Sequence, residues 1–348
     1  MHRTLYLLLT FTMAALMAPA TAVAREADAC ALTVRDADAL LAACSRLIDG
    51  RTLLRGEALA RAHAARGVAW GRKGKYARAI ADMDAALAAR PGDAAVLSQR
   101  GIFKHLSRDF DGAVADYSAS LRIRPDGDTY ANRGESRLEQ NDFAPALQDF
   151  KLAVEINPGF GGYYLRRSLA WRGLGQYERA VRDSDAAIAH PPANAQTFCD
   201  RGIANFYDGR FGAAIPDLEK CPRDDENYGY MLIWRYIAQA REGGDSPGFR
   251  GELDASRAIG SRWPGPVRDM LLGRITPDAL LVAAGISADP VKAAGQDCEA
   301  NFYAGEYQLI RGETGPARLS LSAALGKCSP GFLEYQGAVA ELKRIGGK

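Results

Sequence analysis

The sequence has few of the residues from which catalytic and metal sites are usually built. Only 4 of its 348 residues are histidine, and only His63, His105 and His190 follow residue 24. The chain contains no H-E-x-x-H motif, no C-x-x-C pair and no P-loop spacing. These absences argue against a zinc protease, a thiol oxidoreductase and a nucleotide-binding enzyme. We therefore expect no catalytic residue, no metal and no cofactor.

An excess of charge of one sign is also missing. The chain has 44 Lys and Arg against 42 Asp and Glu, a formal net charge of +2. Polyphosphates and anionic bilayers attract proteins through a large positive charge, which this chain lacks. Nucleic acid is therefore not an expected partner.

A hydrophobic run long enough to cross a bilayer is absent as well. The apolar run from Leu5 to Met17 is shorter than the roughly 18 to 20 residues that a spanning helix needs. It follows Arg3 and precedes the small residues Ala22-Val23-Ala24, a pattern typical of a secretory signal peptide at 1–24. Cys30 lacks the context of a lipid-modified cysteine. We expect an exported periplasmic protein without a membrane anchor.

Cysteine is present in an even number, and all six residues follow the expected signal peptide. Neighbouring cysteines in the sequence bracket predicted helix–turn–helix segments, which favours three local disulfides among the 15 possible connectivities. The predicted pairs are Cys30 with Cys44, Cys199 with Cys221, and Cys298 with Cys328. Free buried thiols are the alternative.

A repeat runs through the middle of the chain. Arg-Gly pairs begin at residues 66, 100, 133 and 201, with Arg167-Ser168 in the gap, so the spacings are 34, 33, 34 and 34. Nine residues after each Gly or Ser stands an aromatic residue, and three residues later an alanine. Each unit predicts a helix, a turn and a second helix. The predicted turns lie at Gly74, Arg108, Asn141, Gly175 and Gly209.

This pattern resembles the tetratricopeptide repeat (TPR), which has a small residue, an aromatic, an alanine and a proline at these offsets. The resemblance implies an all-α solenoid of stacked helical hairpins. We expect a signal peptide at 1–24, an N-terminal helical hairpin at 25–59, five TPR units at 60–222 and a divergent, TPR-like helical C-terminal region at 223–348.

Each repeated arginine is followed sixteen residues later by an aspartate. The two positions lie at equal distances from the turn, so in an antiparallel hairpin both are about 12 Å from it and can meet. A fixed partner in every unit favours a structural ion pair over a ligand contact. The predicted pairs are Arg66 with Asp82, Arg100 with Asp116, Arg133 with Asp149, Arg167 with Asp183, and Arg201 with Asp217.

In TPR proteins the first helices line a concave groove that binds peptides or protein surfaces. The corresponding positions vary from repeat to repeat here, as recognition of one particular partner requires. They are Arg72, His105, Asn132, Glu135, Glu139, Arg166, Arg172 and Tyr207. Ordinary solvated side chains are the alternative interpretation of each.

The C-terminal region has a narrower resemblance. The stretches "WPGPVRDMLLGRITPDAL" and "CEANFYAGEYQLIRG" look like the corresponding half of NlpI-type periplasmic TPR proteins. The resemblance implies a homodimeric adaptor that brings together cell-wall hydrolases and a tail-specific protease. This chain differs in lacking the lipid anchor of that family and in having cysteine pairs.

Three classes of function remain open at this point. An adaptor for other proteins fits the open groove of a TPR stack. A receptor for a small envelope ligand would need a closed apolar pocket. A hydrolase or transferase would have to assemble its site from scattered residues. We therefore predict a scaffold that binds protein partners in the cell envelope.

Overall fold

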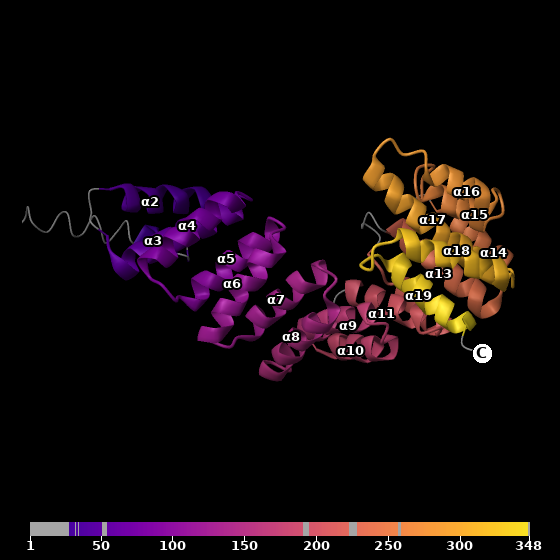
Figure 1. The fold of residues 1–348 in the computed structure, drawn as a ribbon, viewed down its shortest axis with the longest axis horizontal. Coiled ribbons are helices and arrows are strands. Elements are labelled where there is room, and N and C mark those ends of the chain that lie inside the picture. Colours follow the sequence, from indigo (N-terminus) through magenta and orange to yellow (C-terminus); the bar gives the residue numbers. More distant parts are fainter. Residues whose placement is uncertain are drawn as a thin grey trace, which may run out of the picture. The chain divides into compact units, whose positions relative to one another are not determined.

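The computed structural model describes residues 28–31, 33, 35–50, 54–190, 195–222, 228–256 and 259–346. The expected signal peptide at 1–24 lies outside the described residues, and so does Pro192, one of the repeat-closing prolines. The described residues form eighteen helices and no strand (Figure 1). The predicted all-α fold is confirmed. The contacts divide the chain into two compact units, Met1–Ser136 and Arg137–Lys348.

Unit 1 is a series of short antiparallel helices (Figure 1). They are α2 (Ala37–Asp49), α3 (Gly56–Arg72), α4 (Tyr76–Ala89), α5 (Ala94–Leu106), α6 (Phe110–Ile123) and most of α7 (Gly127–Glu139). Each helix from α2 to α6 contacts the next. The apolar core of this unit is divided into local clusters. Leu40 and Leu47 of α2, for example, lie in one cluster with Ala62 and Ala69 of α3.

Unit 2 continues the repeats and adds a helical C-terminal region. The repeat helices are α8 (Phe143–Ile156), α9 (Gly161–Gly173), α10 (Tyr177–Ala189), α11 (Ala195–Tyr207) and α12 (Phe211–Leu218). The others are α13 (Tyr228–Gly243), α14 (Pro247–Ala255), α15 (Gly265–Leu271), α16 (Pro277–Ala284), α17 (Pro290–Ile310), α18 (Thr314–Lys327) and α19 (Leu333–Gly346). Helices α11, α13 and α17 share an aromatic core, in which the Trp234 ring stacks on Phe302 and meets Phe206 edge-on.

The five predicted turns have one backbone geometry. Gly74, Arg108, Asn141, Gly175 and Gly209 all adopt positive φ, from 59° to 78°. In each, the N–H three residues past the end of the first helix donates to the carbonyl two residues before that end, as Lys75 does to Trp70 and Arg210 to Asn205, both at 2.9 Å. Arg108 and Asn141 accept the left-handed conformation that glycine adopts more easily. Gly312 makes the same turn between α17 and α18.

The small residue of the repeat permits a close approach of two helices. A Cβ atom on Gly202 of α11 would lie 3.0 Å from the Leu218 side chain of α12. Gly305 of α17 is in the same situation, since its Cβ would lie 2.6 Å from Leu321 of α18. The α17–α18 hairpin is therefore built like a repeat.

The structure places all three predicted cysteine pairs at bonding distance. The Cα atoms are 4.8 Å apart for Cys30 and Cys44, 5.3 Å for Cys199 and Cys221, and 4.9 Å for Cys298 and Cys328. The first pair lies in unit 1 and the other two in unit 2. In the described part of the chain, no helix is both long and apolar enough to traverse a bilayer.

Candidate partner-binding surface

The repeated arginines and aspartates meet across the two helices of a hairpin. In four repeats the arginine Nε donates to Oδ2 of the aspartate and Nη2 donates to Oδ1. The distances are 2.9 and 2.8 Å for Arg66 with Asp82, and 2.7 and 2.5 Å for Arg100 with Asp116. Both bonds are 2.7 Å long for Arg167 with Asp183 and for Arg201 with Asp217. This two-pronged geometry is the strongest form of the arginine–carboxylate contact.

In the middle repeat, the arginine and the aspartate each contact a further residue, and their pairing with each other stays a prediction. Arg133 Nη1 donates to the Ser118 hydroxyl at 3.0 Å, and the Arg133 guanidinium lies over the Tyr130 ring. Asp149 Oδ2 accepts from Arg137 Nη1 at 2.7 Å. Arg137 is thus a partner of Asp149 that the repeat pattern does not contain.

Burial makes these carboxylates dependent on their partners. Asp82 is 5% exposed, and burial by itself would raise its pKa. Hydrogen bonds from His63, whose Nδ1 lies 3.0 Å from Oδ1, and from Arg66 outweigh burial and hold the pKa of Asp82 below its usual value. His63 therefore has a structural partner.

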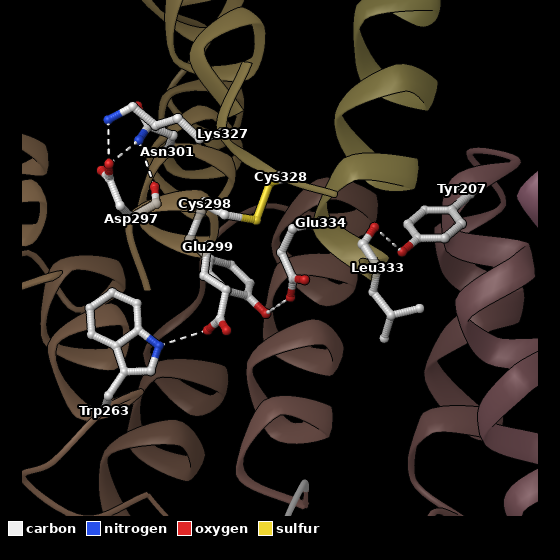
Figure 2. The surroundings of a disulfide bond; sticks show 11 residues. Tyr207, Trp263, Asp297, Cys298, Glu299, Asn301, Lys327, Cys328, Leu333 and Glu334 are labelled. Atoms are coloured by element: carbon white, nitrogen blue, oxygen red, sulfur yellow. Dashed lines mark hydrogen bonds and ion pairs between the residues drawn. A yellow bond between two sulfur atoms is a disulfide. The ribbon is translucent and has the colours of Figure 1, made fainter. Parts of the chain in front are cut away.

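The C-terminal helix α19 packs on the first helices of the last two repeats in unit 2. Figure 2 shows the Tyr207 hydroxyl of α11 directed at the backbone of Leu333, whose carbonyl accepts its hydrogen bond at 2.5 Å. The Tyr177 hydroxyl donates to the Gln336 carbonyl at 3.0 Å, and Arg172 Nε of α9 donates to the Gln336 side chain at 3.2 Å. One face of these repeats therefore already binds a helix, through both backbone and side-chain atoms.

The buried acid Glu334 and the half-buried acid Glu299 lie where α19 meets α17. Glu334 of α19 accepts a hydrogen bond from the Tyr303 hydroxyl at 3.1 Å, and Glu299 of α17 accepts one from the Trp263 indole at 2.6 Å. Figure 2 shows both carboxylates near the Cys298–Cys328 pair. Burial, with the charge of Glu299 second, raises the pKa of Glu334 to about 7. Burial also raises the pKa of Glu299.

The predicted groove residues differ in what they contact and in how exposed they are. Tyr207 is 2% exposed and, with Arg172, contacts α19, so the chain itself occupies these two positions. The His105 ring Nδ1 lies 2.9 Å from the Ser136 hydroxyl, and Arg72 Nη1 donates to the Arg35 carbonyl at 3.3 Å. The other positions are half-buried or exposed on first helices: Asn132, Glu135, Glu139 and Arg166.

Some features of this surface were not predicted from the sequence. The contact of Tyr177 with Gln336 joins segments 159 residues apart, and Glu334 contacts Tyr303 of α17. The repeat pattern has no signal for either contact. A G-x-S-x-G spacing, typical of a hydrolase nucleophile, occurs at Gly244–Gly248. Its serine, Ser246, caps α14 by accepting from the Phe249 N–H at 3.3 Å. The preceding element is the helix α13, whereas a nucleophile elbow follows a strand.

The acidic side chains of the described residues form structural contacts. Within them, no group of three or more His, Cys, Asp or Glu side chains is arranged to hold a metal ion. The buried carboxylates all have partners that fix helices together, such as Arg241, which pairs with Glu306 at 2.8 Å and Glu341 at 3.1 Å.

Comparisons with known proteins identify the repeat. A family model of the tetratricopeptide repeat matches residues 127–160, which hold α7 and α8. Three solved structures are similar to parts of the chain. A TPR repeat-containing protein from Cytophaga hutchinsonii is 16% identical, covering 75% of this chain and 93% of that one, with a TM-score of 0.47. MamA from Desulfovibrio magneticus is 20% identical, with 46% and 92% covered and a TM-score of 0.44. YrrB, described as a TPR protein with an unusual peptide-binding site, is 19% identical, with 46% and 82% covered and a TM-score of 0.41.

Proposed function

We propose that the chain is an exported scaffold that binds other proteins in the cell envelope through the first helices of its repeats. The observation that carries this proposal is the position of α19. Tyr207 of the first helix α11 donates to the Leu333 carbonyl of α19, and Arg172 of the first helix α9 donates to the Gln336 side chain. The packing is close, since a Cβ on Gly337 would lie 3.0 Å from the Tyr207 ring. A surface that accepts a helix in this way suits helical or extended partner segments.

The residue pattern supports the same function. The arginine–aspartate pairs are constant and lie within hairpins, whereas Arg72, His105, Asn132, Glu135, Glu139 and Arg166 differ from repeat to repeat. Variation on exposed first-helix positions suits one particular partner. Three cysteine pairs at bonding distance suit an oxidising compartment such as the periplasm. By resemblance to NlpI-type proteins, the clients are cell-wall hydrolases or a protease.

The experiment is capture from an envelope extract on the immobilised protein, read by mass spectrometry. The test variant is Glu135→Lys with Glu139→Lys, one helical turn apart on α7. The matched control, Glu155→Lys with Glu219→Lys, makes the same charge change at exposed positions on α8 and after α12. Reversed charges at an interface cost several kcal/mol, so the test variant should lose its clients while the control retains them.

Two results would contradict the proposal. A client list without any cell-wall hydrolase or protease would remove the assignment that rests on family resemblance. Equal capture by a folded test variant and by the control would move the binding surface away from α7. Circular dichroism of both variants is the check that the fold is intact.

A further inference from the structure

A pocket of about 640 Å³ opens in unit 2 beside the end of α19. Three segments line it: the turn and first residues of α10 from Gly175 to Arg182, the end of α11 at Tyr207 and Asp208, and α19 at Ala340, Lys343 and Arg344. Its volume falls within the roughly 300 to 1,000 Å³ of ligand pockets. No residue of α7, on which the proposed function is tested, is among these lining residues.

The walls of this pocket carry more positive than negative charge. Four cations line it, namely Arg179, Arg182, Lys343 and Arg344, against the acids Glu178 and Asp208. Both acids already have cationic partners, since Glu178 pairs with Arg182 and Asp208 with Arg210, each at 2.9 Å. Among the described residues, Arg179 and Lys343 make no ion pair. The pocket is therefore a local positive site on a nearly neutral chain.

Two of the cations are held in place. The Arg344 Nη2 donates to the Tyr207 carbonyl at 2.8 Å, and its Nη1 pairs with the buried Glu341. The Arg179 guanidinium lies 4.8 Å from the centre of the Trp171 ring, a cation–π contact. Preorganised cations lose less side-chain entropy when they bind a carboxylate.

We infer that this pocket binds an acidic peptide segment, whose carboxylates pair with Arg179 and Lys343. A concave site of this volume fits a few residues of a chain. A flat anionic bilayer or a nucleic-acid duplex would need cations spread over a wide surface. The net charge of +2 is too small to supply them. Guanidinium groups also match the planar geometry of carboxylates.

The test measures binding of a fluorescent glutamate hexapeptide to the whole protein by anisotropy at low salt. A glutamine hexapeptide is the neutral control. The wild type should bind the glutamate peptide at least about tenfold more tightly, and high salt should remove the difference. Arg179→Glu with Lys343→Glu should weaken binding about tenfold or more, and Arg179→Gln with Lys343→Gln should weaken it less.

The matched control is Arg262→Glu with Lys292→Glu, which makes the same charge change at exposed positions of unit 2 outside the pocket. It should change affinity less than about twofold. Equal binding by the Arg179/Lys343 variant and this control would overturn the inference. So would pyrophosphate that displaces the peptide at an equal concentration of charge, since the pocket would then be a general anion site.

This inference does not depend on the proposed function. The α7 variant Glu135→Lys with Glu139→Lys should bind the glutamate peptide as the wild type does. If that variant loses clients and retains the peptide, the result supports both the proposed function and the peptide site in this pocket. Loss of peptide binding in the α7 variant would overturn the assignment to this pocket and leave the client test unaffected.

Discussion

At the scale of single residues, the paired arginines stabilise buried carboxylates. Arg201 binds Asp217 through two nitrogens at 2.7 Å, and Asp217 is 3% exposed. Arg201→Ala should lower the free energy of unfolding by about 2 to 3 kcal/mol, because the buried carboxylate loses its partner. The control is Arg182→Ala, whose partner Glu178 is solvent-exposed, and it should cost less than about 1 kcal/mol. Urea unfolding gives both values, and equal costs would contradict a structural role for the repeated arginine.

The raised pKa of Glu334 should make the free energy of unfolding depend on pH. Its pKa is raised to about 7 from the usual 4.5, so the folded protein holds a proton that the unfolded chain releases. The free energy of unfolding that this group contributes is therefore fully present below about pH 4.5. It decreases as the pH rises to about 7, by an amount on the order of 1 to 3 kcal/mol. Glu299 and Tyr303 of α17 and Tyr230 of α13 lie around this carboxyl group.

Glu334→Gln tests this dependence. The neutral amide can still accept the Tyr303 hydroxyl hydrogen bond, so the variant should be more stable than the wild type at pH 8. Its loss of stability between pH 5 and pH 7.5 should be smaller, and Glu155→Gln, at an exposed position, should leave the wild-type profile unchanged. Thermal unfolding across this range is the measurement. A profile shared by all three proteins would show that Glu334 ionises normally.

At the scale of elements, one glycine controls how closely α19 approaches its neighbours. A Cβ on Gly337 would lie 2.6 Å from the Phe302 ring and 3.0 Å from the Tyr207 ring. Gly337→Ala should therefore destabilise the protein by about 1 to 3 kcal/mol, because buried rings must move. Gly326→Ala on α18 meets no atom within 4 Å and should be neutral or stabilising by up to about 1 kcal/mol. Denaturant midpoints compare the two, and a harmless Gly337→Ala would contradict the close packing.

The cysteine pairs join neighbouring elements, and each should form a local disulfide. Peptide mapping without reductant should recover Cys30 with Cys44, Cys199 with Cys221, and Cys298 with Cys328. The last pair is 30 residues apart, for which chain entropy implies about 3 to 4 kcal/mol of stabilisation. A Cys298→Ser and Cys328→Ser variant should lose about that much. A cross-link between cysteines of different pairs would contradict the local arrangement.

At the scale of the whole molecule, charge is balanced although one pocket is positive. With a net charge of +2, the protein should not shift duplex DNA in gel electrophoresis at physiological salt, whatever the sequence of the DNA. The glutamate peptide should nevertheless bind, since its site is local. DNA binding that persists at physiological salt would show that the surface concentrates cations beyond the pocket described above.

Much of the repeat region was determined by the sequence itself, because its information is local and periodic. A 34-residue spacing, a turn residue and an aspartate sixteen residues after an arginine place both ends of a contact within one hairpin. Features of this local kind are the positive φ at Gly74, Arg108 and Asn141. The Arg66–Asp82 and Arg201–Asp217 contacts are local in the same way. The start of α16 is also local: the Thr276 hydroxyl caps the helix by accepting from the Ala279 N–H at 3.2 Å, and Pro277 follows as the first helical residue.

The tertiary structure alone decided which first helices are covered and which acids are buried. Tyr207 and Leu333 are 126 residues apart, and Tyr177 and Gln336 are 159 apart, so no period links them. The raised pKa of Glu334 likewise depends on burial between segments that meet only after folding. Contacts within a hairpin follow from the fixed rise of a helix and one turn, whereas contacts between distant helices depend on how the whole unit packs. For this reason the sequence predicts Tyr207 to be a groove residue, whereas in the folded chain Tyr207 contacts α19.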